Sequence, residues 1–306
     1  MIATFDTAAH AAHATRLPRL DSGTRVFRTR DAAGLSDEQL RHVAPSVFAE
    51  DKHASRSARY TYIPTSEIVT GLRREGFLPM EVRQAGSRIA GKAEFTKHLV
   101  RFRHAAQFDL RAAGIQAGDS IPEIILVNSH DGTSSYQLMS GLFRVICQNG
   151  LISATPNTGR SVRVPHTGDI MHQVIDGCVQ ILEDMPATLE RVEHFRGLQL
   201  SDGERRAFAT AALQLRYEDA TDARPAPVGA DTILRANRPA DAAGNLWTTL
   251  NTVQENTVRG GQFFITRDAD GRRRRGTTRE VKGIDGNVSL NRALFTLAEE
   301  MAKLKA

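Results

Sequence analysis

The sequence predicts an α+β protein: a mainly antiparallel sheet with packed helices in the N-terminal half, and a helical C-terminal half. Short apolar stretches with alternating side chains lie between residues 60 and 139, separated by turns that contain glycine. Short connections of this kind favour sequential antiparallel strands. From Gly168 onward the spacing of apolar residues becomes helical. We therefore expect a flexible N-terminal arm over 1–35, an α+β core over 36–165 and a mainly helical region over 166–306.

Two helices are expected early in the core. Ser36 is followed by acidic residues, as at a helix N-terminus, and Pro45 closes the segment. Thr65 can cap a second helix that Gly76 ends, because glycine accepts the left-handed backbone conformation common after a helix.

Strands are expected around and after these helices. The segment ending in Tyr60 and Tyr62 alternates enough to form a short strand, and 80–104 reads as two strands joined by a glycine-rich loop. The stretch 121–139 predicts a hairpin with a tight two-residue turn at its Asp-Gly step. A short helix is predicted over 140–149.

The C-terminal half carries clearer helix signals. Ser201 and Glu204 have the spacing of a capping box. Residues 220–244, rich in Ala, Pro, Asp and Gly, predict a linker, and 267–282 predict a basic loop. Helices are expected on either side of that loop. The helix expected after Gly168 has one apolar stripe, made of Ile170, Val174, Ile175, Cys178, Ile181 and Leu182.

Composition indicates a folded protein of the cytoplasm with a polyanionic partner. The chain has 306 residues, 41% of them hydrophobic and 25% charged, and a formal net charge of +5. A positive balance raises attraction for polyanions, of which nucleic acid ranks before membrane surfaces. We expect no signal peptide and no membrane-spanning run. Cys147 and Cys178 lie apart in apolar contexts, which predicts buried thiols of a reduced compartment.

The densest basic run is a candidate nucleic-acid contact. Arg272, Arg273, Arg274 and Arg275 are consecutive and are bracketed by glycines. Guanidinium groups match phosphate geometry, and each contact would release condensed counterions. The alternative is a solvated loop with no partner.

A second candidate contact combines the helix before the predicted strands with one strand face. Arg73 and Arg74 end that helix, and Lys97, Arg101 and Arg103 share a face by period two. Grooves for single strands pair such basic strips with aromatic faces that stack bases, for which Tyr60 and Tyr62 are candidates. The alternative is an ordinary solvent-facing strand.

Signals for catalysis are sparse. The sequence lacks the G-x-S-x-G, H-E-x-x-H and P-loop patterns. His130 and Asp131 could ligate a divalent metal, but only scattered further ligands are at hand, in His166, Asp169 and His172. We expect Asp131 and Gly132 to shape a structural turn instead. No enzymatic activity, cofactor or metal is expected.

Most of the chain resembles a known family. The segments PEIILVNSHDGTSSYQLMSGLFRVICQNGL, LSDGERRAFATAALQLRYED and NLWTTLNTVQENTVRGG are similar to those of the phage- and plasmid-borne YfjQ/YafZ/YubP group. That group is of unknown function. The chain departs from it in the N-terminal arm and around 262–275.

A weaker resemblance bears on function. The order RYTYIPTSEIVTGLRREGF, hairpin, strand and short helix is similar to the core of single-strand annealing recombinases of the RecT/Erf type. This resemblance implies a homo-oligomeric protein of a mobile genetic element that binds and anneals single-stranded DNA in recombination or DNA maintenance. Two alternatives are a protein-binding anti-defence or regulatory factor, and a metal-dependent nuclease.

Overall fold

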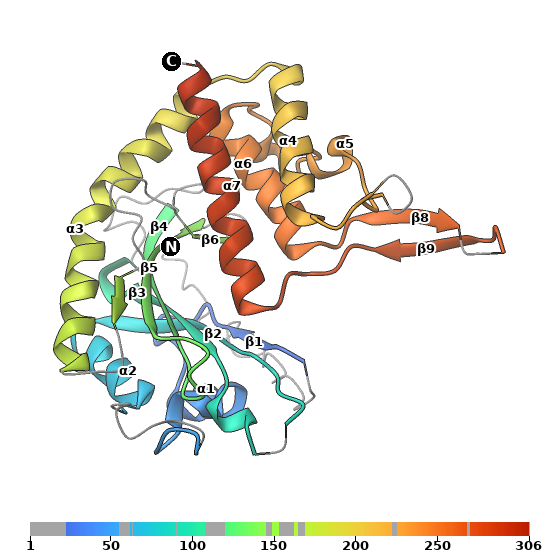
Figure 1. Cartoon of the computed structure of the whole chain (residues 1–306). Helices are drawn as coiled ribbons and strands as arrows, with labels where there is room; N and C mark the ends of the chain where they lie inside the picture. Colours follow the sequence, from blue (N-terminus) through green and yellow to red (C-terminus); the bar gives the residue numbers. More distant parts are fainter. Residues whose placement is uncertain are drawn as a thin grey trace, which may run out of the picture.

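The computed structural model describes residues 23–54, 62, 64–89, 91–107, 120–144, 149–152, 162–164, 169–221, 225–267 and 270–305. Figure 1 shows the sheet in the N-terminal half, a group of helices formed by the C-terminal half, and a two-stranded arm that projects from it. The predicted α+β class, with its mainly antiparallel sheet and helical second half, is confirmed.

The main sheet is antiparallel throughout. Its strands follow chain order from β1 to β6, and β7 pairs with β5 beside β6. Sequential pairing was expected, because short connections join neighbouring antiparallel strands. The strands are β1 (Arg25–Arg28), β2 (Phe77–Gln84), β3 (His98–His104), β4 (Ser120–Asn128), β5 (Tyr136–Arg144), β6 (Asn149–Ile152) and β7 (Val162–Val164).

The helices divide between the two halves. Two lie in the sheet half, and the others follow the sheet in sequence. They are α1 (Asp37–Val43), α2 (Thr65–Arg74), α3 (Ile170–Gly197), α4 (Asp202–Arg216), α5 (Ala230–Ile233), α6 (Leu246–Gln254) and α7 (Ile284–Lys305). A π-helical segment, Glu255–Arg259, continues α6 toward the arm.

One face of the sheet is covered by α1, α2 and the first half of α3. Val100 and Phe102 of β3 point into this core, as do Ile124 and Leu126 of β4. Their even spacing follows from the alternation of side chains along a strand. Val174, Cys178 and Ile181 of α3 close the same core.

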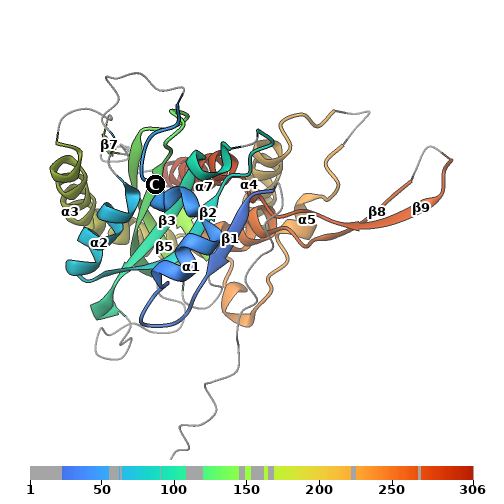
Figure 2. The same cartoon turned by 90° about the horizontal axis from the view of Figure 1, so that it is seen from below.

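The other face meets the start of α7. Leu99, Ile125 and Val127 form a small cluster there with Ile284. A third core lies inside the helical half, where α4, α6 and α7 surround residues such as Trp247. Figure 2, seen from below, shows the sheet between α3 and α7.

The predicted helix ends hold in most cases. Ser36 and Ser201 both form capping boxes, with Gln39 and Glu204 respectively. Gly76 follows α2 with φ +82°. The prediction that Thr65 caps this helix is wrong. Pro64 occupies the N-cap position and Thr65 is the first helical residue. The Thr65 side chain is buried, and its hydroxyl contacts His98 and Asn128 instead of a backbone N–H of the helix.

Two local predictions in the sheet are wrong. The hairpin exists, but the residues between β4 and β5 are 129–135, so its connection is longer than a two-residue turn. The helix predicted over 140–149 is absent from its described part, because β5 continues to Arg144 and pairs with β4 along its length. An apolar run of this length is compatible with either structure, and pairing with β4 selects the strand.

Three predicted flexible or open segments are partly ordered. In the expected arm, β1 pairs with β2, and Leu35 is buried. In the expected linker, α5 buries Ile233, and Asp241 is buried against Arg144. The expected basic loop contains β9 (Arg273–Thr277), paired with β8 (Phe263–Arg267). Residues 1–22 and Cys147 lie outside the described residues.

Candidate nucleic-acid interface

The arm formed by β8 and β9 is the best candidate for a nucleic-acid contact. Figures 1 and 2 both show it leaving the helical half and pointing away from the rest of the protein. Its two strands pair antiparallel, from Phe263 opposite Thr277 to Arg267 opposite Arg273. All four consecutive arginines are exposed, and three of them lie within β9.

The root of the arm is firmly held. Gly260 has φ +67°, and a Cβ there would lie 2.6 Å from the carbonyl oxygen of Thr278. The Gly261 N–H donates to that same oxygen at 2.8 Å. Farther out, the ring of Phe264 covers Gly276, where a Cβ would lie 2.7 Å from Cζ. These contacts give the arm a defined direction.

Basic and apolar side chains share one face of the arm. Residues paired directly across an antiparallel ladder point to the same side, and side chains two apart on a strand do so too. The register therefore places Phe263, Ile265, Arg273 and Arg275 together, on what we call the outer face. Phe263 is 56% exposed and Ile265 is 46% exposed.

The remaining arginines of the run point elsewhere. Arg274 lies on the opposite face of β9, and Arg272, which precedes the strand, is 3.5 Å from Asp270. Phe263 and Ile265 were missed in the sequence. Their signal is the aromatic and β-branched run Phe263–Thr266, which precedes the arginines at the distance of a hairpin partner.

The second predicted basic strip does not form an exposed surface. Arg101 and Arg103 share a face as expected, but they are 3% and 7% exposed. Both pair with Glu123 on β4: Arg101 Nε lies 2.7 Å from its Oε2 and Arg103 Nη2 lies 2.9 Å from its Oε1. The Arg103 guanidinium also lies 4.0 Å from the Phe143 ring centre. The expected solvent face is therefore a buried ionic layer.

Lys97 and Arg73, two other residues of this predicted basic strip, form ion pairs and hydrogen bonds within the protein. Lys97 Nζ donates to both carboxylate oxygens of Asp285, at 2.7 and 2.8 Å. Arg73 pairs with Asp37 and donates to the carbonyl of Leu35 at 2.6 Å, which ties α2 to the start of α1. Arg74 is exposed at the end of α2.

The proposed base-stacking tyrosines gain little support. Tyr60 lies outside the described residues. Tyr62 packs its ring edge against His130, with centroids 5.0 Å apart, and its hydroxyl donates to the carbonyl of Ala49.

His130 belongs to a buried polar network below α2. The Thr65 hydroxyl lies 2.9 Å from His98 Nε2, 3.3 Å from His130 Nε2 and 3.0 Å from the Asn128 amide nitrogen. All four residues are fully buried. Burial disfavours the charged imidazolium and lowers the pKa of His98 to about 4. The network connects the first turn of α2 to β3 and to the end of β4.

Asp131 and Gly132 lie in a turn between β4 and β5. Asp131 Oδ1 accepts hydrogen bonds from the Thr133 N–H at 3.0 Å and the Thr133 hydroxyl at 2.6 Å. Its Oδ2 lies 3.3 Å from Lys92 Nζ. Burial alone would raise the pKa of Asp131, but these hydrogen bonds and Lys92 hold it below the usual value. Gly132 has φ +78°.

We expect Gly132→Val to lower the free energy of unfolding by about 1–3 kcal/mol, since a β-branched residue is strained at positive φ. Asp131→Asn keeps an oxygen acceptor for Thr133 and should cost about 1 kcal/mol or less. Thermal melts of both variants, with and without manganese, would measure this ranking. A manganese-dependent rise in melting temperature that Asp131→Asn removes would instead identify a metal ligand.

The other metal-ligand candidates are separate from this turn in sequence and role. Asp169 accepts the His172 N–H at 3.1 Å as the N-cap of α3, and His166 lies outside the described residues. Across the described ranges, no three His, Cys, Asp or Glu side chains are grouped as metal ligands would be. Within the same ranges, no helix has both the length and the apolarity to cross a bilayer.

The fold and the arm define an α+β protein with a buried ionic layer and a basic two-stranded projection. The chain belongs to the family described as "Domain of unknown function (DUF932)", whose model matches residues 52–295. It is similar to the UPF0380 proteins YafZ and YfjQ of Escherichia coli strain K12, at 44% and 43% identity. Each alignment covers 87% of this chain and 91% of the relative.

These relatives confirm the resemblance to the YfjQ/YafZ group that the sequence segments indicated. No solved structure matches the chain significantly.

Proposed function

We propose that the protein binds single-stranded nucleic acid, with DNA the favoured form, through the outer face of the arm. The observation that carries this proposal is the common orientation of Phe263, Ile265, Arg273 and Arg275 on a projecting ribbon. Guanidinium groups would contact phosphates, and the exposed aromatic ring would stack on a base.

A projecting ribbon suits a long, thin polyanion. Its outer face offers two arginines separated by one residue on β9, which places both on the same side of the strand. Contacts of this kind release counterions and depend steeply on salt. A two-stranded ribbon can also enter the major groove of a duplex. Phe263 favours the single strand, because base faces are accessible for stacking only when bases are unpaired.

The wider role that we propose is annealing in recombination or DNA maintenance of a mobile element, in the cytoplasm and without catalysis. A strand held mainly through its phosphates, with one ring stacked, leaves most base edges open to a complementary strand. The buried location of Arg101 and Arg103 removes the sheet from this proposal and leaves the arm as its basis.

We expect the double variant Arg273→Gln/Arg275→Gln to bind a single-stranded oligonucleotide more weakly at low salt. Loss of two phosphate contacts should also flatten the dependence of log affinity on log salt by about 1.4 units, at roughly 0.7 units per contact for single strands. Fluorescence anisotropy across a salt series would measure both effects.

The matched control is Arg272→Gln/Arg274→Gln, which removes the same charge from the same hairpin. Arg274 lies on the opposite face of β9, so this variant should retain most of the affinity and slope of the parent. Equal losses in the two double variants would mean that overall charge, not the outer face, attracts the oligonucleotide. Absence of binding by the parent at low salt would end the proposal, and tighter binding to a duplex would reassign it to double-stranded DNA.

A further inference from the structure

We propose that Arg216 is the positioning residue of the arm: its guanidinium group holds both ends of the β8–β9 hairpin against α4 and so fixes the direction of the outer face. Arg216 is the last residue of α4 and belongs to neither strand of the arm. The benefit of a fixed direction rests on the proposed binding of nucleic acid by the arm, whereas the fixed direction itself can be measured without it.

The Arg216 guanidinium donates to the chain on both sides of the arm. Its Nε lies 3.1 Å from the carbonyl oxygen of Thr257, which precedes β8, and its Nη2 lies 3.1 Å from the carbonyl oxygen of Arg279, which follows β9. Nε and Nη2 form one edge of a planar group whose donors point in fixed directions. The guanidinium carbon also lies over the Tyr217 ring, 5.0 Å from its centre. One rigid side chain therefore sets the position of both roots relative to α4.

The carbonyl of Thr257 needs a partner from outside its own helix. Thr257 lies near the end of the π-helical segment, where carbonyl groups have no N–H of the same helix to accept from. An arginine near a helix C-terminus can donate to such a carbonyl and interacts favourably with the helix dipole. The bond from Arg216 therefore supplies a hydrogen bond that this helix cannot make by itself.

The two roots of the arm lie close enough for one side chain to reach both. A Cβ at Gly260 would lie 2.8 Å from the carbonyl oxygen of Arg279, which is the second acceptor of Arg216. The Val281 N–H, after the arm, donates to the carbonyl of Val258, before it, at 2.8 Å. These contacts join the two roots to each other, and Arg216 joins both of them to α4.

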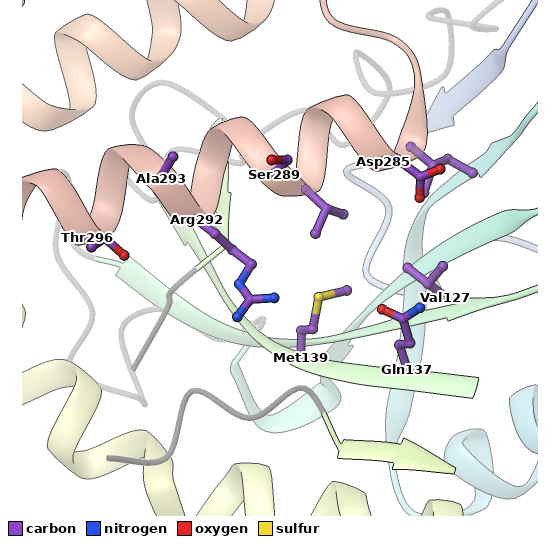
Figure 3. A pocket seen from close by; sticks show the side chains of 10 residues that line it. Val127, Gln137, Met139, Asp285, Ser289, Arg292, Ala293 and Thr296 are labelled. Atoms are coloured by element: carbon purple, nitrogen blue, oxygen red, sulfur yellow. The ribbon is translucent and has the colours of Figure 1, made fainter. Parts of the chain in front are cut away.

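Farther out, the arm depends on its root for direction. Phe264 packs at the edge of the helical core, but a space of about 1060 Å³, lined by Phe264 and Thr266, separates β8 from α7. On α7 this space is lined by Ser289 and Ala293, whose side chains are small (Figure 3). The five residues of β8 span about 17 Å. A small tilt at the root would therefore displace the far end of the outer face by several ångströms.

The first test measures the direction of the arm without nucleic acid. Spin labels would be attached through an unnatural amino acid at Thr266 on the arm and at Gln180 on α3, both of which are exposed. The distribution of distances between the labels should be narrow in the parent and markedly broader in Arg216→Gln and in Arg216→Lys. Lysine keeps the charge but lacks the planar fork that reaches both carbonyls.

Arg206→Gln is the matched control for this measurement. It removes an exposed arginine of the same helix, paired with Asp231 at 2.9 Å, and should keep the narrow distribution of the parent. All three variants should melt near the temperature of the parent, because Arg206 is exposed and Arg216 is half-buried. A narrow distribution in both Arg216 variants, or a broad one already in the parent, would overturn the proposal.

The second test measures binding of a single-stranded oligonucleotide by fluorescence anisotropy. Affinity should fall about tenfold in both Arg216 variants if the competent direction is then populated about a tenth of the time. The salt dependence should remain that of the parent, because a positioning residue makes no phosphate contact. A phosphate contact would instead flatten the slope of Arg216→Gln by about 0.7 units.

Such a flattened slope, or an affinity like that of the parent in Arg216→Lys, would overturn the positioning role. A parent protein that does not bind the oligonucleotide would end the proposed function instead. In that case the label distances alone decide whether Arg216 positions the arm, so the two failures are distinguishable.

Discussion

Replacement of Glu123 by glutamine should lower the free energy of unfolding by about 3–5 kcal/mol, the usual cost of removing one partner from a buried ion pair. Glu123 is 2% exposed and its two oxygens are shared between Arg101 and Arg103. Glutamine has nearly the same shape, so packing is preserved while the negative charge is lost. Two guanidinium groups would then remain buried beside a neutral amide.

The surroundings offer limited compensation for that loss. Arg101 also interacts electrostatically with Glu81, on the neighbouring strand β2. Burial alone would raise the pKa of Glu81, but Arg83 and Arg28 hold it well below the usual range. Glu81 already forms ion pairs with these two arginines, so it cannot fully replace Glu123 as a partner of Arg101. The Arg101 side chain packs closely against β5, because a Cβ at Gly141 would lie only 2.9 Å from Arg101 Nη2.

Urea denaturation of the parent and of Glu123→Gln would measure the difference. Glu218→Gln is a suitable control, since it removes the same charge from an exposed position and should shift stability by about 0.5 kcal/mol or less. If both variants unfold at the parent's urea concentration, the ionic layer contributes nothing and the arginines are adequately solvated.

Acidification should destabilise the protein through His98. Its folded-state pKa of about 4 lies below the ordinary value of 6.5. Between these values the unfolded chain binds a proton that the folded protein excludes. Stability due to His98 is therefore complete above about pH 6.5 and is lost as pH falls toward 4, by about 3 kcal/mol in total.

Burial favours the neutral ring of His98, and the hydrogen bonds around the ring determine which nitrogen carries the proton. The Ser46 hydroxyl donates to Gln84 Oε1 at 2.7 Å, so it accepts from the His98 Nδ1–H at 2.9 Å. Nε2 then accepts from the Thr65 hydroxyl. The carbonyl of Thr96, 3.3 Å from Nδ1, and the charge of Asp131 both favour the protonated ring, but burial outweighs them.

Urea melts at several pH values between 7 and 4 would measure the effect. Carboxylates titrate in the lower part of this range in any variant, so the informative quantity is the difference between the parent and His98→Gln. The variant should lose stability less steeply between pH 6.5 and 4. Parallel curves for the two proteins would show that His98 accepts its proton without cost in the folded state.

Short sequence motifs correctly predicted the helix ends, because a helix end depends on only a few neighbouring residues. The capping boxes at Ser36 and Ser201 and the glycine after α2 need only a few neighbouring residues, and they occur where expected. The pairing of β2 with β3 likewise follows from two alternating segments and a glycine-rich connection. These features persist because no distant part of the chain competes with them.

Features set by distant residues could not be predicted in the same way. Alternation indicates that Arg101 and Arg103 share a face, but it does not tell which face is covered or that Glu123 lies opposite. The arginine run resembles a loop until Phe263–Arg267 is recognised as its strand partner. Ile175, expected in a buried stripe, is 42% exposed, because the rotation of α3 against the sheet decides which side chains of that helix are covered.

The continuous length of α3 has a mechanical consequence. Its 28 residues pass from the core beneath the sheet, at Val174, to the helical core, at Phe195, without interruption at Pro186. A cut anywhere along it would expose one core or the other. We expect both halves to unfold in one cooperative transition, and fragments that end near residue 165 to be recovered as insoluble chains rather than as independent domains.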